Sequence, residues 1–181
     1  MRADSLISLH PGPAAGFDSP FEMLAACHQR VQRMLGLLSR LSAHLAQHGA
    51  DDAARQAARD VMRYFDQAGP AHHEDEERHI LPRLRECGRS ALANRLHADH
   101  EAMASAWREL RVDLQRVIEG PWAAASQHEA DRRWLAFAAL YRDHIGAEED
   151  DAYPAVRDGL GAETEQAMGR EMAARRGVPA D

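Results

Sequence analysis

The chain has 181 residues, of which 45% are hydrophobic, and this is enough for one domain with a substantial core. A formal net charge of −7 argues against a nucleic-acid partner held through its phosphates, and no run of about 18 apolar residues is present to span a membrane. The start of the chain does not resemble a signal peptide and the two cysteines lack metal-type spacing, so we expect a reduced, cytoplasmic setting.

The first elements in chain order are an irregular tail and a long helix. Residues 1–18 are interrupted by proline and glycine and show no periodicity, which predicts an N-terminal tail. Ser19, Pro20 and Glu22 form a capping box with proline in the first turn, so a helix should begin there and run to about Gln47. Its apolar residues recur at helical spacing and share their face with a histidine, His28.

A second helix should begin at Asp51 or Asp52 and end near Cys87-Gly88. Its apolar stripe continues into His72 and Glu76. Gly69-Pro70 interrupts the pattern just before these residues, and a proline inside a helix removes a hydrogen bond, so a kink is expected there.

The third helix should span Ser90–Glu119, where apolar steps alternate between four and three residues as in a bundle seam that also contains His100. A capping box at Ser126–Glu129 predicts a fourth helix to about Leu160, and a short last helix should cover Glu163–Arg175. The predicted fold is therefore all-α. It is an antiparallel up-down four-helix bundle over residues 19–161, followed by a short C-terminal helix and tail at 162–181.

A histidine-glutamate motif occurs twice, and it is the strongest functional signal in the chain. His72/Glu76 and His144/Glu148 have i,i+4 spacing, each pair is followed by a second glutamate, and a proline lies ten residues after each histidine. Residues four apart share one helix face, so each pair can present two ligands to one point. With one histidine on each remaining long helix, the sequence predicts a buried metal site; the alternative is a structural polar layer.

The ligand chemistry limits the choice of metal. Imidazole and carboxylate without thiolate suit iron, manganese or zinc. Two carboxylates able to bridge favour two ions over one, and the set is larger than the four ligands that zinc usually takes. Iron with an open position is the first choice, and manganese or zinc are alternatives.

These residues resemble the hemerythrin-like (HHE cation-binding) family, in particular its bacterial branch. The pattern of one histidine on the first and third helices and His-x-x-x-Glu on the second and fourth matches over about Phe21 to Leu160. Family members are four-helix bundles with an oxo- or hydroxo-bridged di-iron centre. The resemblance implies two non-haem irons held by a set in which Glu76 and Glu148 bridge. The implied metal ligands are His28, His72, His73, Glu76, His100, His144 and Glu148.

His73 enters this set from one branch only, the iron-sensing domain of a ubiquitin-ligase subunit, which has an extra ligand directly after the second-helix histidine. The alternative to a ligand role for His73 is a position that faces solvent or lies behind the metal ligands. The oxygen-carrying members have two histidines four apart on the third helix, but here Leu96 precedes His100. They also carry an aspartate where Glu149 stands, so dedicated oxygen transport is not implied.

The remaining polar residues receive structural interpretations. His97 is expected at the surface, and a place behind the metal ligands is its alternative. Apart from Glu76, the acidic run Glu74 to Glu77 is expected to be mostly a solvated face. Glu76 and His79 form one Glu-x-x-His motif, whereas the ferritin-like fold needs two. Tyr141 is the one proton donor that the sequence suggests near the site, but simple packing is the favoured interpretation of this residue.

Three functions remain open from the sequence. The first is a di-iron protein that binds or reacts with O2, peroxide or nitric oxide in sensing, iron handling or stress response. The second is a di-iron oxidoreductase, so whether the chain is an enzyme is undecided and no catalytic residue is assigned. The third is a metal-responsive regulatory module, whose protein partner the sequence does not identify.

Overall fold

The computed structural model describes residues 16–120 and 122–178, and the expected tail at 1–18 lies mostly outside this range. The long helices are α1 (Pro20–His48), α2 (Asp52–His79), α4 (Ser90–Glu119) and α5 (Ala124–Ala147). Shorter elements are α3 (Leu81–Glu86), the π-helical turn η1 (Glu148–Ala152), α6 (Tyr153–Arg157) and α7 (Ala162–Arg175). The described residues contain no strand, which confirms the all-α class.

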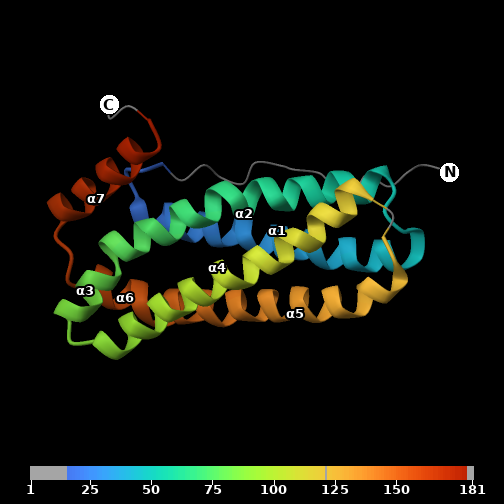
Figure 1. Ribbon diagram of the computed structural model, residues 1–181. Helices are drawn as coiled ribbons and strands as arrows, with labels where there is room; N and C mark the ends of the chain where they lie inside the picture. Colours follow the sequence, from blue (N-terminus) through green and yellow to red (C-terminus); the bar gives the residue numbers. More distant parts are fainter. Residues whose placement is uncertain (1–15, 121, 179–181) are drawn as a thin grey trace.

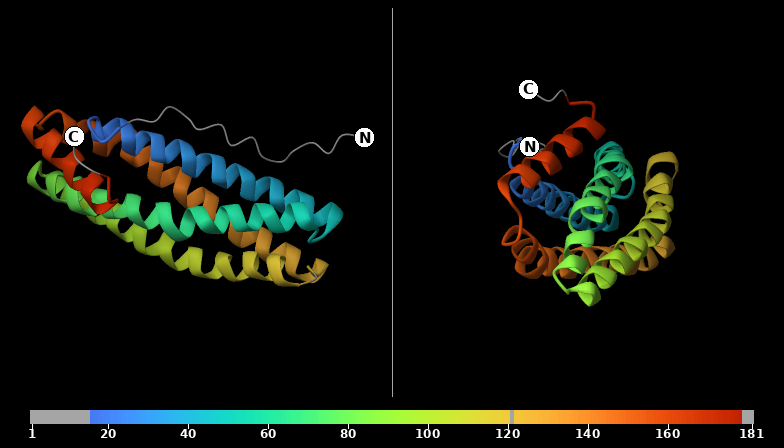
Figure 2. Two further views of the ribbon diagram at one scale, coloured as in Figure 1. Left: turned by 90° about the horizontal axis from the view of Figure 1, so that it is seen from above. Right: turned by 90° about the vertical axis from the view of Figure 1, so that its left-hand side faces the viewer.

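The long helices lie side by side, and successive ones run in opposite directions (Figures 1 and 2). Contacts join α1 to α2, α2 to α4, α4 to α5, and α5 back to α1, so each long helix has two neighbours. The short helix α7 packs on one end of this bundle, beside the start of α1. None of the helices in the described ranges has the length and hydropathy that a membrane span requires.

Two apolar clusters fill the bundle, and a polar layer separates them. One cluster, towards the α1–α2 and α4–α5 connections, contains Phe65, Phe137 and Tyr141. The other contains Leu24 and Leu84 together with residues of α6 and α7. Along each long helix the chain passes from one cluster to the other through a buried histidine, so the polar layer is enclosed by apolar side chains at both ends.

One predicted helix start needs correction, and one predicted cap is absent. α1 begins where expected, but the Ser19 side chain makes no capping hydrogen bond. α5 begins at Ala124, before the expected capping box at Ser126. At the start of α2, the Asp51 side chain accepts a hydrogen bond from the Ala54 backbone N–H, as an N-cap does.

The two prolines of the repeated motif mark where the ligand-bearing helices change. α2 is continuous through Pro70 and is interrupted at Ile80, two residues before Pro82. Pro82 has no N–H to donate to the carbonyl four residues earlier, and its ring crowds that turn. Pro154 likewise follows the π-helical turn, so the predicted fourth helix is divided into α5, η1 and α6.

Candidate metal centre

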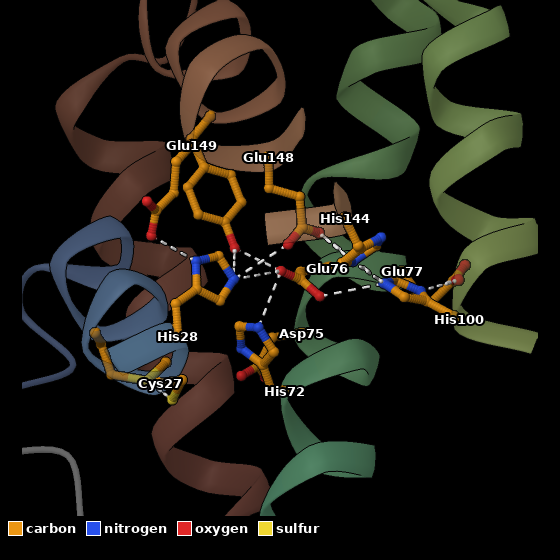
Figure 3. A network of polar contacts seen from close by, with 12 residues as sticks. Cys27, His28, His72, Asp75, Glu76, Glu77, His100, His144, Glu148 and Glu149 are labelled. Atoms are coloured by element: carbon orange, nitrogen blue, oxygen red, sulfur yellow. Dashed lines mark hydrogen bonds and ion pairs between the residues drawn. The ribbon is translucent and has the colours of Figure 1, made fainter. Parts of the chain in front are cut away.

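Each long helix contributes one buried histidine to the polar layer: His28 on α1, His72 on α2, His100 on α4 and His144 on α5. Two glutamates, Glu76 and Glu148, complete the layer and have no exposed surface. Figure 3 shows these side chains pointing toward one another. The i,i+4 spacing explains the geometry, because each glutamate lies one turn beyond a histidine on the same helix face.

The six side chains form two overlapping groups whose ligand atoms lie within 4.8 Å of one another. Both glutamates belong to both groups. One group adds His28 and His72, and the other adds His100 and His144.

Each glutamate turns one oxygen to each group. Glu76 Oε1 lies 3.2 Å from His72 Nε2, whereas its Oε2 lies 3.4 Å from His100 Nε2. Glu148 Oε2 lies 3.1 Å from His28 Nε2, whereas its Oε1 lies 3.0 Å from His144 Nε2. Each carboxylate can therefore offer one oxygen to each group.

Unpaired buried atoms test whether a metal fits this layer. Among the described residues, Glu76 Oε2 and both carboxylate oxygens of Glu148 are buried without a hydrogen-bond partner, as are His72 Nδ1 and His73 Nε2. A buried carboxylate without a partner is costly. The converging imidazoles also face each other, since His100 Nε2 lies 3.1 Å from His144 Nε2. Carboxylate oxygens and imidazole nitrogens that converge in this way suit a cation, because the cation supplies the partner that the glutamate oxygens lack.

Carboxylates outside the layer contact the Nδ1 atoms of three of the four histidines, on the side of each ring that faces away from the centre. His28 Nδ1 lies 2.8 Å from Glu149 Oε1, and His100 Nδ1 lies 2.8 Å from Glu77 Oε1. His144 Nδ1 has a longer contact of 3.4 Å with Asp99 Oδ2. In each case Nε2 is left facing the centre, which is the usual support for a metal-ligating histidine.

A tyrosine, Tyr153, reaches the centre because of the π-helical turn. In η1 the Tyr153 N–H bonds to the Glu148 carbonyl, so residues five apart are aligned. The Tyr153 hydroxyl donates to Glu76 Oε1 at 2.5 Å and lies 3.2 Å from His28 Nε2. Its ring stacks on His28 at a centroid distance of 5.5 Å.

The buried charges act strongly on the pKa values of the histidines. Burial alone lowers the pKa of His28, but the carboxylates of Glu148 and Glu76 outweigh burial and raise it to about 10. His100 behaves alike: burial opposes its charge, and Glu76 with Glu77 raises its pKa to about 9. For His72 burial dominates and lowers the pKa to about 3.

The two glutamates differ from each other. Burial and the charge of Glu76 together raise the pKa of Glu148. Burial also opposes ionisation of Glu76, but the surrounding imidazoles, His72 first, lower its pKa well below the ordinary value. One carboxylate is thus held charged while its neighbour is driven toward the protonated form.

The other predicted residues take different places. His73 belongs to neither group of convergent ligand atoms in the described residues, and its ring stacks on His100 at a centroid distance of 4.2 Å. Tyr141 packs in the apolar cluster beside Phe65 and stacks on His73 at 5.9 Å. His97 is exposed, as expected, but its Nδ1 contacts Glu77 at 2.8 Å.

The acidic run beside Glu76 is solvated only in part: Glu74 is exposed as expected, but Asp75 and Glu77 are not simply surface residues. Glu77 supports His100, and Asp75 is fully buried. Arg175 and Arg176 at the end of α7 both donate hydrogen bonds to the Asp75 carboxylate. The C-terminal helix is thereby attached to the segment of α2 that carries His72 and Glu76.

Close packing sets the position of α7. A Cβ atom added to Gly169 would lie 1.9 Å from the Phe17 carbonyl oxygen, so only glycine allows α7 to approach the start of α1 this closely. Arg176 also lies over the Phe17 ring, 5.6 Å from its centroid.

Comparisons with known proteins agree with this geometry. A family model described as the hemerythrin HHE cation binding domain matches residues 19–156. A protein of Haemophilus influenzae described as an uncharacterized protein is 33% identical over 172 residues, which cover 94% of this chain and 97% of that relative. All six convergent side chains lie inside the matched range.

Proposed function

Because the chain belongs to the hemerythrin HHE cation-binding family, we propose that it is a non-haem di-iron protein that binds or reacts with O2, peroxide or nitric oxide. The observation that carries the proposal is the sharing of both carboxylates between two groups of ligand atoms. A single ion beside His28 and His72 would leave Glu76 Oε2 and Glu148 Oε1 buried without a partner. A single ion in the other group would leave Glu148 Oε2 without one, whereas Glu76 Oε1 accepts a hydrogen bond from Tyr153. Two ions would use all four oxygens.

The proposed ligands follow from this division. His28 and His72 would hold one iron, His100 and His144 the other, and Glu76 with Glu148 would bridge them. His73 remains a weaker candidate, since its buried Nε2 has no partner in the described part of the chain but lies outside both groups. The donor set lacks thiolate and favours iron, with manganese or zinc as alternatives.

Iron, when bound, would supply electrons and an open coordination position for a small molecule. The residues of the chain supply the surroundings. The apolar clusters on both sides of the layer limit the entry of water. The Tyr153 hydroxyl holds a proton 2.5 Å from Glu76 Oε1.

Tyr153 also favours a second candidate function, a di-iron oxidoreductase that consumes peroxide or nitric oxide. Reduction of either molecule needs a proton donor near the open position, and the sequence suggested only Tyr141 for this role. The Tyr153 hydroxyl lies within hydrogen-bond distance of two candidate ligands, His28 and Glu76, whereas Tyr141 packs in the apolar cluster. Steady-state turnover by the iron-loaded protein, reduced in Tyr153→Phe at unchanged iron content, would favour this candidate.

Metal analysis and an optical spectrum of protein from iron-supplemented cells test the main proposal. We expect about two irons per chain and the near-ultraviolet absorption of an oxo- or hydroxo-bridged ferric pair. A stoichiometry near one zinc per chain without a ferric band would contradict the proposal.

A further inference from the structure

The glutamate that follows each candidate bridging glutamate has a contact of its own. Glu77 follows Glu76 on α2, and its Oε1 lies 2.8 Å from Nδ1 of His100 on α4. Glu149 follows Glu148 in η1, and its Oε1 lies 2.8 Å from Nδ1 of His28 on α1. Figure 3 shows both contacts at opposite sides of the centre.

We propose that Glu77 and Glu149 are positioning residues, each of which orients the histidine of one metal ion. This inference rests on the proposed two-ion centre. Consecutive helix residues project roughly 100° apart around the axis. When the first glutamate points into the bundle, the second therefore points toward a neighbouring helix, from α2 to His100 of α4 and from η1 to His28 of α1.

A carboxylate on Nδ1 fixes which imidazole nitrogen faces the centre. It accepts the Nδ1–H, so Nε2 keeps its lone pair for the metal, and it also limits rotation of the ring. His28 Nε2 and His100 Nε2 both face the two buried glutamates, as this arrangement requires.

The support is divided evenly between the two groups of ligand atoms. In the first group, the Nδ1 of His28 has a carboxylate at 2.8 Å, from Glu149. The Nδ1 of His72, the other histidine of that group, has no hydrogen-bond partner within the described residues. His100 is the corresponding histidine in the other group, because the His144 Nδ1 contact with Asp99 is longer, at 3.4 Å. Each ion would thus depend on one glutamate outside the layer.

Titration of Co²⁺ into the metal-free, full-length protein in competition with a chelator tests this inference. The visible spectrum of bound Co²⁺ reports the number of ions and their ligand field. Glu149→Ala should weaken one of two ions by about 10- to 100-fold and leave the other unchanged, and Glu77→Ala should do the same to the other ion. Glu77→Gln and Glu149→Gln should weaken binding less, because the amide oxygen can still accept the Nδ1–H.

Matched controls separate orientation from charge. Asp150→Asn removes an exposed charge next to Glu149, and Glu101→Gln removes one next to His100; neither Asp150 nor Glu101 has a polar side-chain contact within the described ranges. Both controls should bind two Co²⁺ ions with wild-type affinity. Circular dichroism of each metal-free variant checks that its helices are intact.

Two results would overturn the inference. Alanine variants within about twofold of their controls would exclude a positioning role, since such a role is expected to cost at least tenfold. Equal weakening of both ions by each variant would contradict the division between ions. A wild-type protein that binds a single Co²⁺ ion would instead contradict the two-ion centre itself.

Discussion

Glu76 and Glu148 determine the chemistry of the layer, because each turns one oxygen to each group of histidines. Their carboxylates are fully buried and lie 3.0 to 3.4 Å from imidazole nitrogens of both groups. Glu76 also accepts the hydrogen bond from Tyr153, whereas both oxygens of Glu148 lack a hydrogen bond among the described residues. The demand for a cation is therefore strongest at Glu148.

Single-residue substitutions should rank the ligands accordingly. We expect Glu148→Ala and Glu76→Ala to lose both irons, because each carboxylate touches both ions. His73→Ala should keep both irons, since His73 lies outside the two groups. Iron content after gel filtration measures the effect. An empty site in His73→Ala together with two irons in Glu148→Ala would reverse this ranking.

The convergence of the six candidate ligands could be predicted from the sequence, whereas the residues that support them could not. An i,i+4 pair on a helix has a fixed geometry, so His72/Glu76 and His144/Glu148 follow from spacing alone. The contact between His28 and Glu149 spans 121 residues, and it depends on how α1 packs against η1. The second glutamate of each motif, Glu77 or Glu149, is visible in the sequence. Which histidine it contacts depends on how the helices pack, and the sequence alone does not give this packing.

At the level of secondary-structure elements, the π-helical turn is the feature that an α-helical reading misses. In an α-helix Ala152 would lie one turn beyond Glu148, but in η1 the residue aligned with Glu148 is Tyr153. The sequence correctly indicated the long helices and Pro154 as a boundary marker. Nothing in the residue pattern shows that the turn before Pro154 contains an extra residue, which aligns Tyr153 with Glu148. The sequence therefore suggests Tyr141 as the proton donor and not Tyr153.

Deletion of one residue distinguishes this turn from an ordinary helix. Deleting the exposed Asp151 should convert η1 to an α-helical turn with Glu148 and Tyr153 still aligned, now four apart. The variant should therefore retain iron and most of its melting temperature. Deleting the exposed Arg142 should rotate His144 and Glu148 by roughly 100° relative to the preceding helix and abolish iron binding. Loss of iron and a large fall in melting temperature in the Asp151 deletion as well would argue against the π-helical register.

The attachment of α7 to α2 should contribute strongly to stability. Asp75 is fully buried and receives hydrogen bonds from Arg175 and Arg176, which are partly exposed. Replacing both arginines by alanine leaves a buried charge without its partners, which costs about 3 kcal/mol of unfolding free energy. Adding Asp75→Asn to that variant should recover most of this loss, because the charge is then absent.

Urea unfolding of the metal-free proteins measures these differences. The double arginine variant serves as the reference for the Asp75→Asn addition, so both share the same truncated α7 end. A loss below about 1 kcal/mol in the double variant would mean that Asp75 is solvated or otherwise compensated. A further loss on adding Asp75→Asn would contradict the explanation by buried charge.

For the whole molecule, the polar layer links stability to pH. In the metal-free protein the pKa of His28 is about 10 and that of His100 about 9, both above the ordinary value of 6.5. Their stabilising contribution is fully present below pH 6.5 and is lost as pH rises through 9 to 10. The pKa of His72 is about 3, and burial lowers that of His73 as well. Below pH 6.5 these two histidines bind protons in the unfolded chain but remain neutral in the folded protein. The free energy of unfolding therefore also decreases as the pH falls below 6.5.

The metal-free protein should therefore melt highest near pH 6.5 and progressively lower on both sides. Bound metal should remove the alkaline decline, because Nε2 of His28 and His100 then holds the ion and has no proton to lose. The difference in melting temperature between the loaded and the metal-free protein should widen from pH 6.5 to 9, since metal competes with protons for the same nitrogens. Calorimetric scans of both forms across this range measure the difference. A gap that stays constant with pH would mean that metal binding releases no proton, so that His28 and His100 carry none in the metal-free bundle.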